Sequence, residues 1–128
     1  MKEPLWISEK EAKAIHDLLI TIHGGSPGIR DENLLSASLA RPRHIWTYSN
    51  PNLFDLGAAY GYGLTKNHPF VDGNKRTAFV VMVTFLEVNG FLVTASETEV
   101  VIAMERLACN IITQDALAIW LQENSQEV

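Results

Sequence analysis

Residues 68–76, which read HPFVDGNKR, carry more groups capable of chemistry than any other stretch of this chain. They include a histidine, a carboxylate, a carboxamide and two cations, and a long apolar run follows them. Gly73 interrupts regular structure, and the residues from Asn74 onward suit a helix. The first amide groups of a helix have no partner inside it and attract anions. The pattern therefore predicts an anion site at a helix start near Gly73.

The side chains around this helix start favour phosphate as the anion. Arg76 can bind two phosphate oxygens at once, and Lys75 supplies a compact positive charge. Asp72 fits such a site if a Mg²⁺ ion bridges its carboxylate and the phosphate. His68 carries an imidazole, which can take a proton from an attacking hydroxyl. A base, a metal ligand and a phosphate cradle together indicate phosphoryl or nucleotidyl transfer.

Each of these residues also has a plainer explanation. His68 could be a structural loop residue, Asp72 could only cap the helix, and the two cations could form a solvated face. A metal site built on His68 and Asp72 is disfavoured, because no second histidine lies nearby. Phe70 is expected to be a core anchor that holds the loop. The combination of roles within one short stretch favours the functional interpretation.

Composition bounds the class of protein. The chain has 128 residues, 47% of them hydrophobic, and a formal net charge of −5, which predicts one globular domain over residues 1–128. This net negative charge argues against non-specific electrostatic binding of nucleic acid. The longest apolar run, 78–83, is too short to span a membrane, and the N-terminus does not resemble a signal peptide. We expect a cytoplasmic protein without nucleic-acid or membrane partners, in which the single cysteine, Cys109, is a buried apolar residue.

Helical periodicity and capping patterns dominate the chain and predict an all-α bundle. The first three expected helices span about residues 8–23, 31–41 and 52–66. A fourth is expected to begin near residue 73 and to contain the apolar run 77–89, and two more are expected to begin at residues 96 and 113. The run 77–89 is apolar on all sides and is expected to be the central buried helix. Three glycines in the helix over 52–66 weaken it and call for close packing against a neighbour. A nucleotide-binding glycine loop is rejected there, because neither glycine signature of such loops is present.

Three segments are expected outside the helices. Residues 43–51 are aromatic and β-branched and stand between prolines, which favours a short extended flap. Residues 91–94 are expected to form an extended link. The chain after Glu123 is expected to fray.

Residues 68–76 resemble the signature of the Fic family, commonly written H-P-F-x-D/E-G-N-x-R-x-x-R. Within that superfamily the chain is most similar to the death-on-curing (Doc) branch, the toxins of toxin–antitoxin modules. Three features carry the narrower similarity: residues 74–78 (NKRTA), the upstream segment 23–31 (HGGSPGIRD) and the short all-helical length. The resemblance runs from Ser8 to Leu121 and implies a compact Fic fold.

The resemblance also implies roles for individual residues. His68 corresponds to the general base that activates a hydroxyl on a target protein, and Asp72 to the acidic residue that holds Mg²⁺. The residues that correspond to the nucleotide-binding groups are Gly73 and Asn74 at the anion hole, Arg76 as the first phosphate-binding arginine, and Lys75 as the added cation of the Doc branch.

One position departs from the signature and decides between two reactions. AMP-transferring members carry a second arginine where this chain has Phe79, and phenylalanine cannot bind a terminal phosphate. Doc-like members are understood to bind ATP in the reverse orientation and to transfer its γ-phosphate. The resemblance therefore implies a protein kinase toxin that uses ATP and Mg²⁺ to modify a threonine of translation elongation factor Tu. It also implies a cognate antitoxin that silences the site and a flap, around residues 45–48, that aligns the target as an added strand.

Two other functions remain open at the level of sequence. The same residues could transfer AMP to a protein hydroxyl. Alternatively, the chain could be a catalytically silent Fic-fold module that uses its cationic pocket to hold a nucleotide or a peptide.

Overall fold

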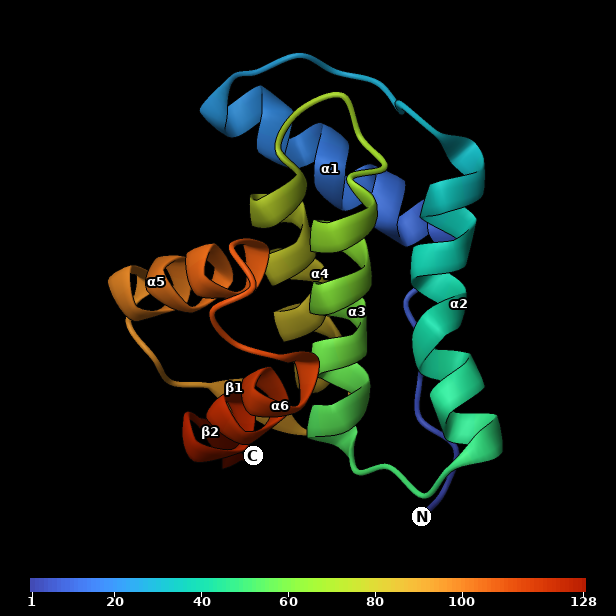
Figure 1. Cartoon of the computed structure of the whole chain (residues 1–128), viewed down its shortest axis with the longest axis vertical. Coiled ribbons are helices and arrows are strands. Elements are labelled where there is room, and N and C mark those ends of the chain that lie inside the picture. The colour runs from blue at the N-terminus through green and yellow to red at the C-terminus, as the bar shows by residue number, and fades with distance from the viewer.

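The computed structural model describes residues 1–128 and contains six helices and one small antiparallel sheet (Figure 1). The helices are α1 (Glu9–His23), α2 (Glu32–Tyr48), α3 (Leu53–Asn67), α4 (Asn74–Val88), α5 (Glu97–Ala108) and α6 (Gln114–Glu123). The strands are β1 (Phe91–Val93) and β2 (Ser125–Glu127). The all-α prediction is confirmed. None of the helices has the length and apolar character needed to cross a membrane.

The helices begin where the sequence predicts. Ser8, Asn52 and Ser96 each form a reciprocal capping box with the residue three positions further on. Asp31 and Thr113 each accept a hydrogen bond from a first-turn amide. A cap of this kind stabilises a helix by about 1 kcal/mol. The polar residues at these positions therefore set the starts of five of the six helices.

The predicted extended flap is wrong, because residues 43–48 are helical. α2 does not end near Arg41 and Pro42 but continues through this proline to Tyr48. A proline inside a helix removes a hydrogen bond and crowds the preceding turn. Here that cost is offset by burial, because Pro42 itself is buried and the Ile45 and Trp46 side chains beyond it pack against the core. Tertiary packing thus outweighs the local preference for an extended chain.

The most buried helix is α3 rather than the predicted α4. Ten of the 15 residues of α3 are buried, against seven of 15 in α4. α3 lies between α2 and α4, and α6 crosses it (Figure 1). A Cβ at Gly61 would lie 2.8 Å from the Met82 sulfur, and one at Gly63 would lie 3.3 Å from the Ser38 backbone. The prediction that the glycines of this helix permit close packing is therefore confirmed.

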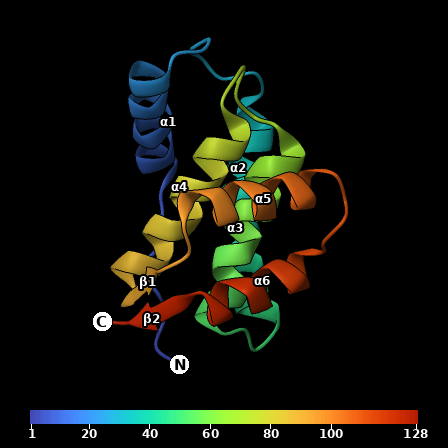
Figure 2. The same cartoon turned by 90° about the vertical axis from the view of Figure 1, so that its left-hand side faces the viewer.

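The C-terminal tail is ordered, so the prediction that it frays is wrong. β2 pairs antiparallel with β1, the segment predicted to be extended (Figure 2). The Phe91 ring packs edge-on against the Phe54 ring at 5.0 Å between centroids. Pairing with β1 satisfies backbone groups of the tail that would otherwise need water.

Cys109 is exposed, which corrects the prediction that it is buried. It is the C-cap of α5 and follows the last buried position of that helix, Leu107. Position 109 lies seven and four residues after Ile102 and Glu105, so helical spacing places it on the exposed face of α5.

Candidate active site

The HPFVDGNKR motif forms the turn between α3 and α4, at one end of the bundle (Figure 1). His68 is the C-cap of α3 in a left-handed conformation, with φ of 51°. Gly73 is the N-cap of α4, also left-handed, with φ of 73°. A left-handed conformation costs a non-glycine residue on the order of 1–2 kcal/mol. The surrounding structure must therefore hold His68 in place.

Part of that support comes from the segment between α1 and α2, which runs beside the motif. Ile29 and Phe70 form an antiparallel bridge, and Val71 N donates to the Gly28 carbonyl at 3.1 Å. The Phe70 side chain is fully buried in the core, as predicted. The motif backbone is thus fixed on one side by a strand-like contact and on the other by its own phenylalanine.

Arg30 supports the histidine directly. Its Nε donates to the His68 carbonyl at 2.7 Å, and its Nη2 donates to the Asn67 carbonyl at 2.8 Å. These carbonyls lie at the C-terminus of α3, where a cation is favoured by the helix dipole. Arg30 therefore holds the backbone that carries the His68 ring.

Asn74 fixes the inside of the turn. It is only 3% exposed. Its Oδ1 accepts from Phe70 N, and its Nδ2 donates to the Phe70 carbonyl, both at 2.9 Å. The same Nδ2 lies 3.1 Å from His68 Nδ1. Because the side chain is fully engaged within the protein, the group that Asn74 can offer an anion is its backbone amide.

The contact with Asn74 also bears on the protonation of His68. The backbone partners orient the Asn74 amide so that its nitrogen faces the ring, and His68 Nδ1 is then the acceptor. In the neutral ring the proton lies on Nε2. His68 can therefore receive a proton at Nε2 only in the other tautomer, at the expense of the hydrogen bond from Asn74.

Asp72 has an exposed carboxylate that accepts two backbone amides. Its Oδ2 accepts from Ser26 N at 3.2 Å, and its Oδ1 accepts from Gly73 N at 2.8 Å. These two hydrogen bonds, from Ser26 and then Gly73, hold the pKa of the Asp72 carboxyl below its usual value. The carboxylate is therefore ionised at neutral pH and retains lone pairs for a cation.

A cavity of about 660 Å³ lies beside the motif, between α4 and α5. Figure 2 shows α5 lying across the bundle in front of α4. The cavity is within the size range of small-molecule sites. It brings together all six residues predicted from the sequence: His68, Asp72, Gly73, Asn74, Lys75 and Arg76. The facing wall on α5 is mainly apolar, with Val100, Val101 and Met104, and it also carries Glu97 and Glu105. On the motif side, Phe79 and Val80 of α4 add apolar surface.

The two cations of the motif differ in their surroundings. Lys75 Nζ pairs with Glu105 Oε1 of α5 at 2.5 Å, and both side chains are about half exposed. Arg76 is exposed and takes part in no ion pair. A phosphate in the cavity therefore has Arg76 immediately available, whereas it must compete with Glu105 for Lys75.

Four residues that contact the motif have no role in the sequence analysis: Ser26, Arg30, Glu105 and His16, whose Nε2 lies 2.9 Å from the Asp72 carbonyl oxygen. His16 follows Ala12 by four positions, so helical spacing already places it on the buried face of α1. Ser26 and Arg30 lie in segment 23–31, which carried the resemblance to the Doc branch but without individual roles. Glu105 has no sequence signal, because its contact with Lys75 depends on how α5 packs.

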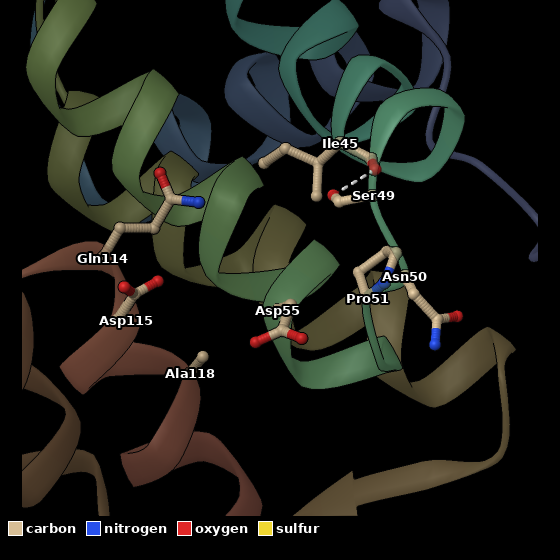
Figure 3. Close-up of a pocket in the computed structure, with 8 residues that line it drawn as sticks. All are labelled: Ile45, Ser49, Asn50, Pro51, Asp55, Gln114, Asp115 and Ala118. Atoms are coloured by element: carbon tan, nitrogen blue, oxygen red, sulfur yellow. Dashed lines mark hydrogen bonds between the residues drawn. The ribbon is translucent and has the colours of Figure 1, made fainter.

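A second, smaller cavity of about 240 Å³ lies among the end of α2, the start of α3 and α6 (Figure 3). The Asp55 and Asp115 carboxylates lie beside it. Asp55 is engaged in capping α3, where its Oδ2 accepts from Asn52 N. No residue of the motif lines this cavity. The cavity beside the motif is therefore the candidate active site.

Comparison with known proteins agrees with the fold and the motif. The sequence profile of the Fic/DOC family matches residues 6–86, more than half of the chain, and the chain belongs to this family. The matched region includes α1 to α3 and nearly all of α4, but not α5.

Two relatives narrow the similarity to Doc proteins. A protein named Toxin Doc from Mycolicibacterium smegmatis is 43% identical over 74 residues, which cover 56% of this chain and 57% of that protein. A protein named Protein kinase doc from Escherichia phage P1 is 36% identical over 85 residues, which cover 66% of this chain and 68% of that protein. The chain thus aligns with little more than half the length of the mycobacterial relative.

Proposed function

We propose that this protein is the toxin of a toxin–antitoxin system and acts in the cytoplasm as an ATP- and Mg²⁺-dependent protein kinase. It transfers the γ-phosphate to a threonine or serine hydroxyl of a target protein. By its resemblance to the Doc branch the target is translation elongation factor Tu, so the reaction inhibits translation, and a cognate antitoxin controls it. The observation that carries the proposal is the convergence of a base, an ionised carboxylate, a helix start and a free arginine on one cavity.

The residues at the start of α4 suit the phosphates of ATP. Gly73 has no Cβ, and the nearest atom to one built there is a methyl carbon of Ile20 at 3.4 Å. The first amides of α4 and the Arg76 guanidinium can therefore bind phosphate oxygens together. The exposed, ionised carboxylate of Asp72 would hold Mg²⁺, which commonly takes one or two carboxylates and completes its shell with phosphate oxygens and water. When bound, ATP and Mg²⁺ supply the transferable group and neutralise its charge.

His68 is the group that handles the proton. In the tautomer with a free Nε2, it takes the proton of the attacking hydroxyl as the new bond from that oxygen to the γ-phosphorus forms. The bond from this phosphorus to the oxygen it shares with the β-phosphate breaks, and ADP leaves. The turn that carries the ring is held for this step by the hydrogen bond from Arg30 Nε to the His68 carbonyl. The hydrogen bond from Asn74 to Nδ1 is lost in this tautomer, because Nδ1 then carries the proton.

Phe79 favours phosphate transfer over AMP transfer. It lies one turn beyond Arg76 on α4 and lines the cavity, where it adds apolar surface rather than a second cation. A nucleotide in the AMP-transferring orientation would have its terminal phosphate near this ring, without a charged partner. AMP transfer to a protein hydroxyl is the second candidate, because every other motif residue serves it equally well.

The experiment that decides between these reactions uses ATP labelled separately at its α- and γ-phosphates. The purified protein is incubated with cell extract and each nucleotide in turn. Label from the γ-position on protein is the expected result, and label from the α-position on protein would replace the kinase by an AMP transferase. Absence of both labels, together with normal growth of cells that express the protein, would indicate a silent binding module.

A further inference from the structure

The buried histidine of α1, His16, is a polar core residue that the proposed reaction does not use. It is 1% exposed, and its ring stacks on the Phe70 ring with centroids 3.9 Å apart and an angle of 6° between planes. Its Nε2 lies 2.9 Å from the backbone carbonyl oxygen of Asp72. A carbonyl oxygen can only accept, so Nε2 must carry a proton and donate it.

Packing alone does not account for a histidine at this position. A leucine or methionine could fill the same space against Phe70 without burying a polar ring. Burying a polar group is costly unless it forms a hydrogen bond, and the bond that His16 Nε2 forms is to the Asp72 carbonyl. A donor at position 16 is therefore needed for the hydrogen bond to the Asp72 carbonyl, and a histidine supplies it.

The carbonyl of Asp72 belongs to the same peptide plane as the amide of Gly73. All peptide bonds in the chain are trans, so this carbonyl and this amide point in opposite directions. With the carbonyl turned inward to His16, the Gly73 amide points outward, where it donates to the Asp72 carboxylate at 2.8 Å. One hydrogen bond in the core thus sets the direction of a donor at the active site.

This plane needs such a restraint because glycine does not supply one. Gly73 has a φ of 73°, and a residue without a Cβ tolerates the conformations on either side of a peptide flip. A flip would turn the Gly73 amide away from the Asp72 carboxylate and place the carbonyl oxygen at the anion site.

We propose that His16 is a positioning residue: by holding the Asp72 carbonyl, it keeps the Asp72–Gly73 peptide in the one orientation that presents the Gly73 amide and the Asp72 carboxylate to the cavity. That this cavity binds Mg²⁺ and ATP rests on the proposed function. The orientation of the peptide does not depend on the proposed function, so an experiment can contradict the role of His16 and the proposed function independently.

The test compares three variants with the wild-type protein. His16→Leu keeps the apolar bulk and removes the donor. His16→Gln places an amide nitrogen near the position of Nε2 and keeps the donor. Tyr60→Phe is the control, because the Tyr60 hydroxyl also accepts a hydrogen bond from a buried backbone group, Ile7 N at 2.9 Å, but lies outside the cavity.

The first measurement is hydrogen exchange of the Gly73 and Ser26 amides by NMR in the nucleotide-free protein. We expect exchange of these two amides to be about tenfold faster in His16→Leu than in the wild type, near wild type in His16→Gln, and unchanged in Tyr60→Phe. Unchanged exchange in a folded His16→Leu protein would overturn the proposal. So would equal acceleration in the leucine and glutamine variants, because the donor would then be irrelevant.

The second measurement is phosphate transfer as a function of Mg²⁺ concentration. Loss of a residue that orients a metal ligand typically costs about 10- to 100-fold in affinity or activity, so the half-saturating Mg²⁺ should rise about tenfold in His16→Leu and recover in His16→Gln. Faster exchange in His16→Leu with an unchanged Mg²⁺ dependence would overturn the link to the site.

A wild-type protein without any transfer would contradict the proposed function, and the exchange data would still decide the role of His16. If His16→Leu does not fold, His16→Asn replaces it, because its shorter side chain brings the amide less far than glutamine does. The proposal then requires faster exchange in the asparagine variant than in the glutamine variant, and equal exchange in the two would overturn it.

Discussion

The two walls of the candidate active site are built in different ways. The motif wall, from His68 to Arg76, is held by hydrogen bonds to its backbone from His16, Arg30 and Asn74. The α5 wall is mainly apolar, and its one ion pair to the motif is between Glu105 and Lys75. The motif wall lies within the region that matches the Fic/DOC family, whereas α5 lies outside it.

The difference between the two walls suits two tasks, the chemical step at the motif wall and ligand binding at the α5 wall. Groups that move protons and bind phosphate must be held within a fraction of an ångström, and that requires a network of hydrogen bonds. A wall that only covers a ligand needs shape and apolar surface. We therefore expect substitutions on the motif wall to lower the rate of transfer, and substitutions on the α5 wall to change affinity.

The largest expected effect is that of His68→Ala. Removing a general base typically costs about 10²- to 10⁴-fold in rate, so the turnover number should fall at least about 100-fold while ATP binding changes little. The measurement is single-turnover transfer together with ATP binding by calorimetry. His44→Ala is the control, because His44 is an exposed histidine of α2 that does not line the cavity. Full activity of His68→Ala would remove His68 from the mechanism.

Arg30→Ala should have the next largest effect. The substitution removes two hydrogen bonds to the backbone of Asn67 and His68 and so loosens the turn that carries the His68 ring. We expect the turnover number to fall about tenfold with a nearly constant KM for ATP, because a misplaced catalytic group loses rate before affinity.

The matched control for this prediction is Arg43→Ala. The Arg43 guanidinium lies over the Trp6 ring at 5.5 Å from its centroid and does not line the cavity. If Arg30→Ala raised the KM and left the turnover number intact, Arg30 would be a substrate contact rather than a support for His68.

Glu105→Gln tests the opposite wall and should strengthen binding. Glu105 forms an ion pair with Lys75, and an exposed ion pair contributes about 0.2–1 kcal/mol. Releasing the lysine should therefore lower the dissociation constant for ATP by a factor of about 1.4 to 5. The measurement is calorimetric titration with ATP at low ionic strength. Glu97→Gln removes the same charge from the same wall without freeing a lysine and should have a smaller effect. Equal gains in both variants would mean that net charge, not the Lys75 pair, controls affinity.

The smallest expected effect is a pH dependence of stability that arises at Asp72. The pKa of its carboxyl is lowered in the folded protein, so its hydrogen bonds stabilise the fold above the ordinary aspartate range, and this contribution is lost as the pH falls through the lowered pKa. Denaturant titrations of the wild type and Asp72→Asn should therefore differ in the free energy of unfolding at pH 7 and converge as the pH falls below about 4. A difference that stayed constant down to a pH of about 2 would mean that the ionised carboxylate is not its source.

Local signals were enough for most of the helices and for the motif. The polar residues Ser8, Asn52 and Ser96 predict helix starts because a cap acts within one turn. The six residues of the motif could be identified because they are neighbours in the chain, and the turn between α3 and α4 keeps them together. Their individual roles remain predictions.

Errors arose where distant contacts decide the conformation. The aromatic and β-branched residues around Trp46 predict an extended flap, but their burial against the core continues α2 through Pro42. The tail after Glu123 has no local reason to be ordered, yet it pairs with β1 across more than 30 positions of sequence. The prediction that Cys109 is buried is wrong for a different reason, because helical spacing places it on the exposed face of α5 with Ile102 and Glu105, and this position outweighs its apolar character.

The sequence by itself determined the chemical groups of the site, the helix start that gathers them and the helical class of the fold. These depend on residue types and on spacings shorter than about two helical turns, which act within any local stretch of chain. Only the tertiary structure decided what holds and faces that site: His16 and Arg30 behind the motif, and α5 with Glu105 across from it. Those contacts join residues more than 25 positions apart, and such contacts form only when the packing of the core selects one arrangement of the helices.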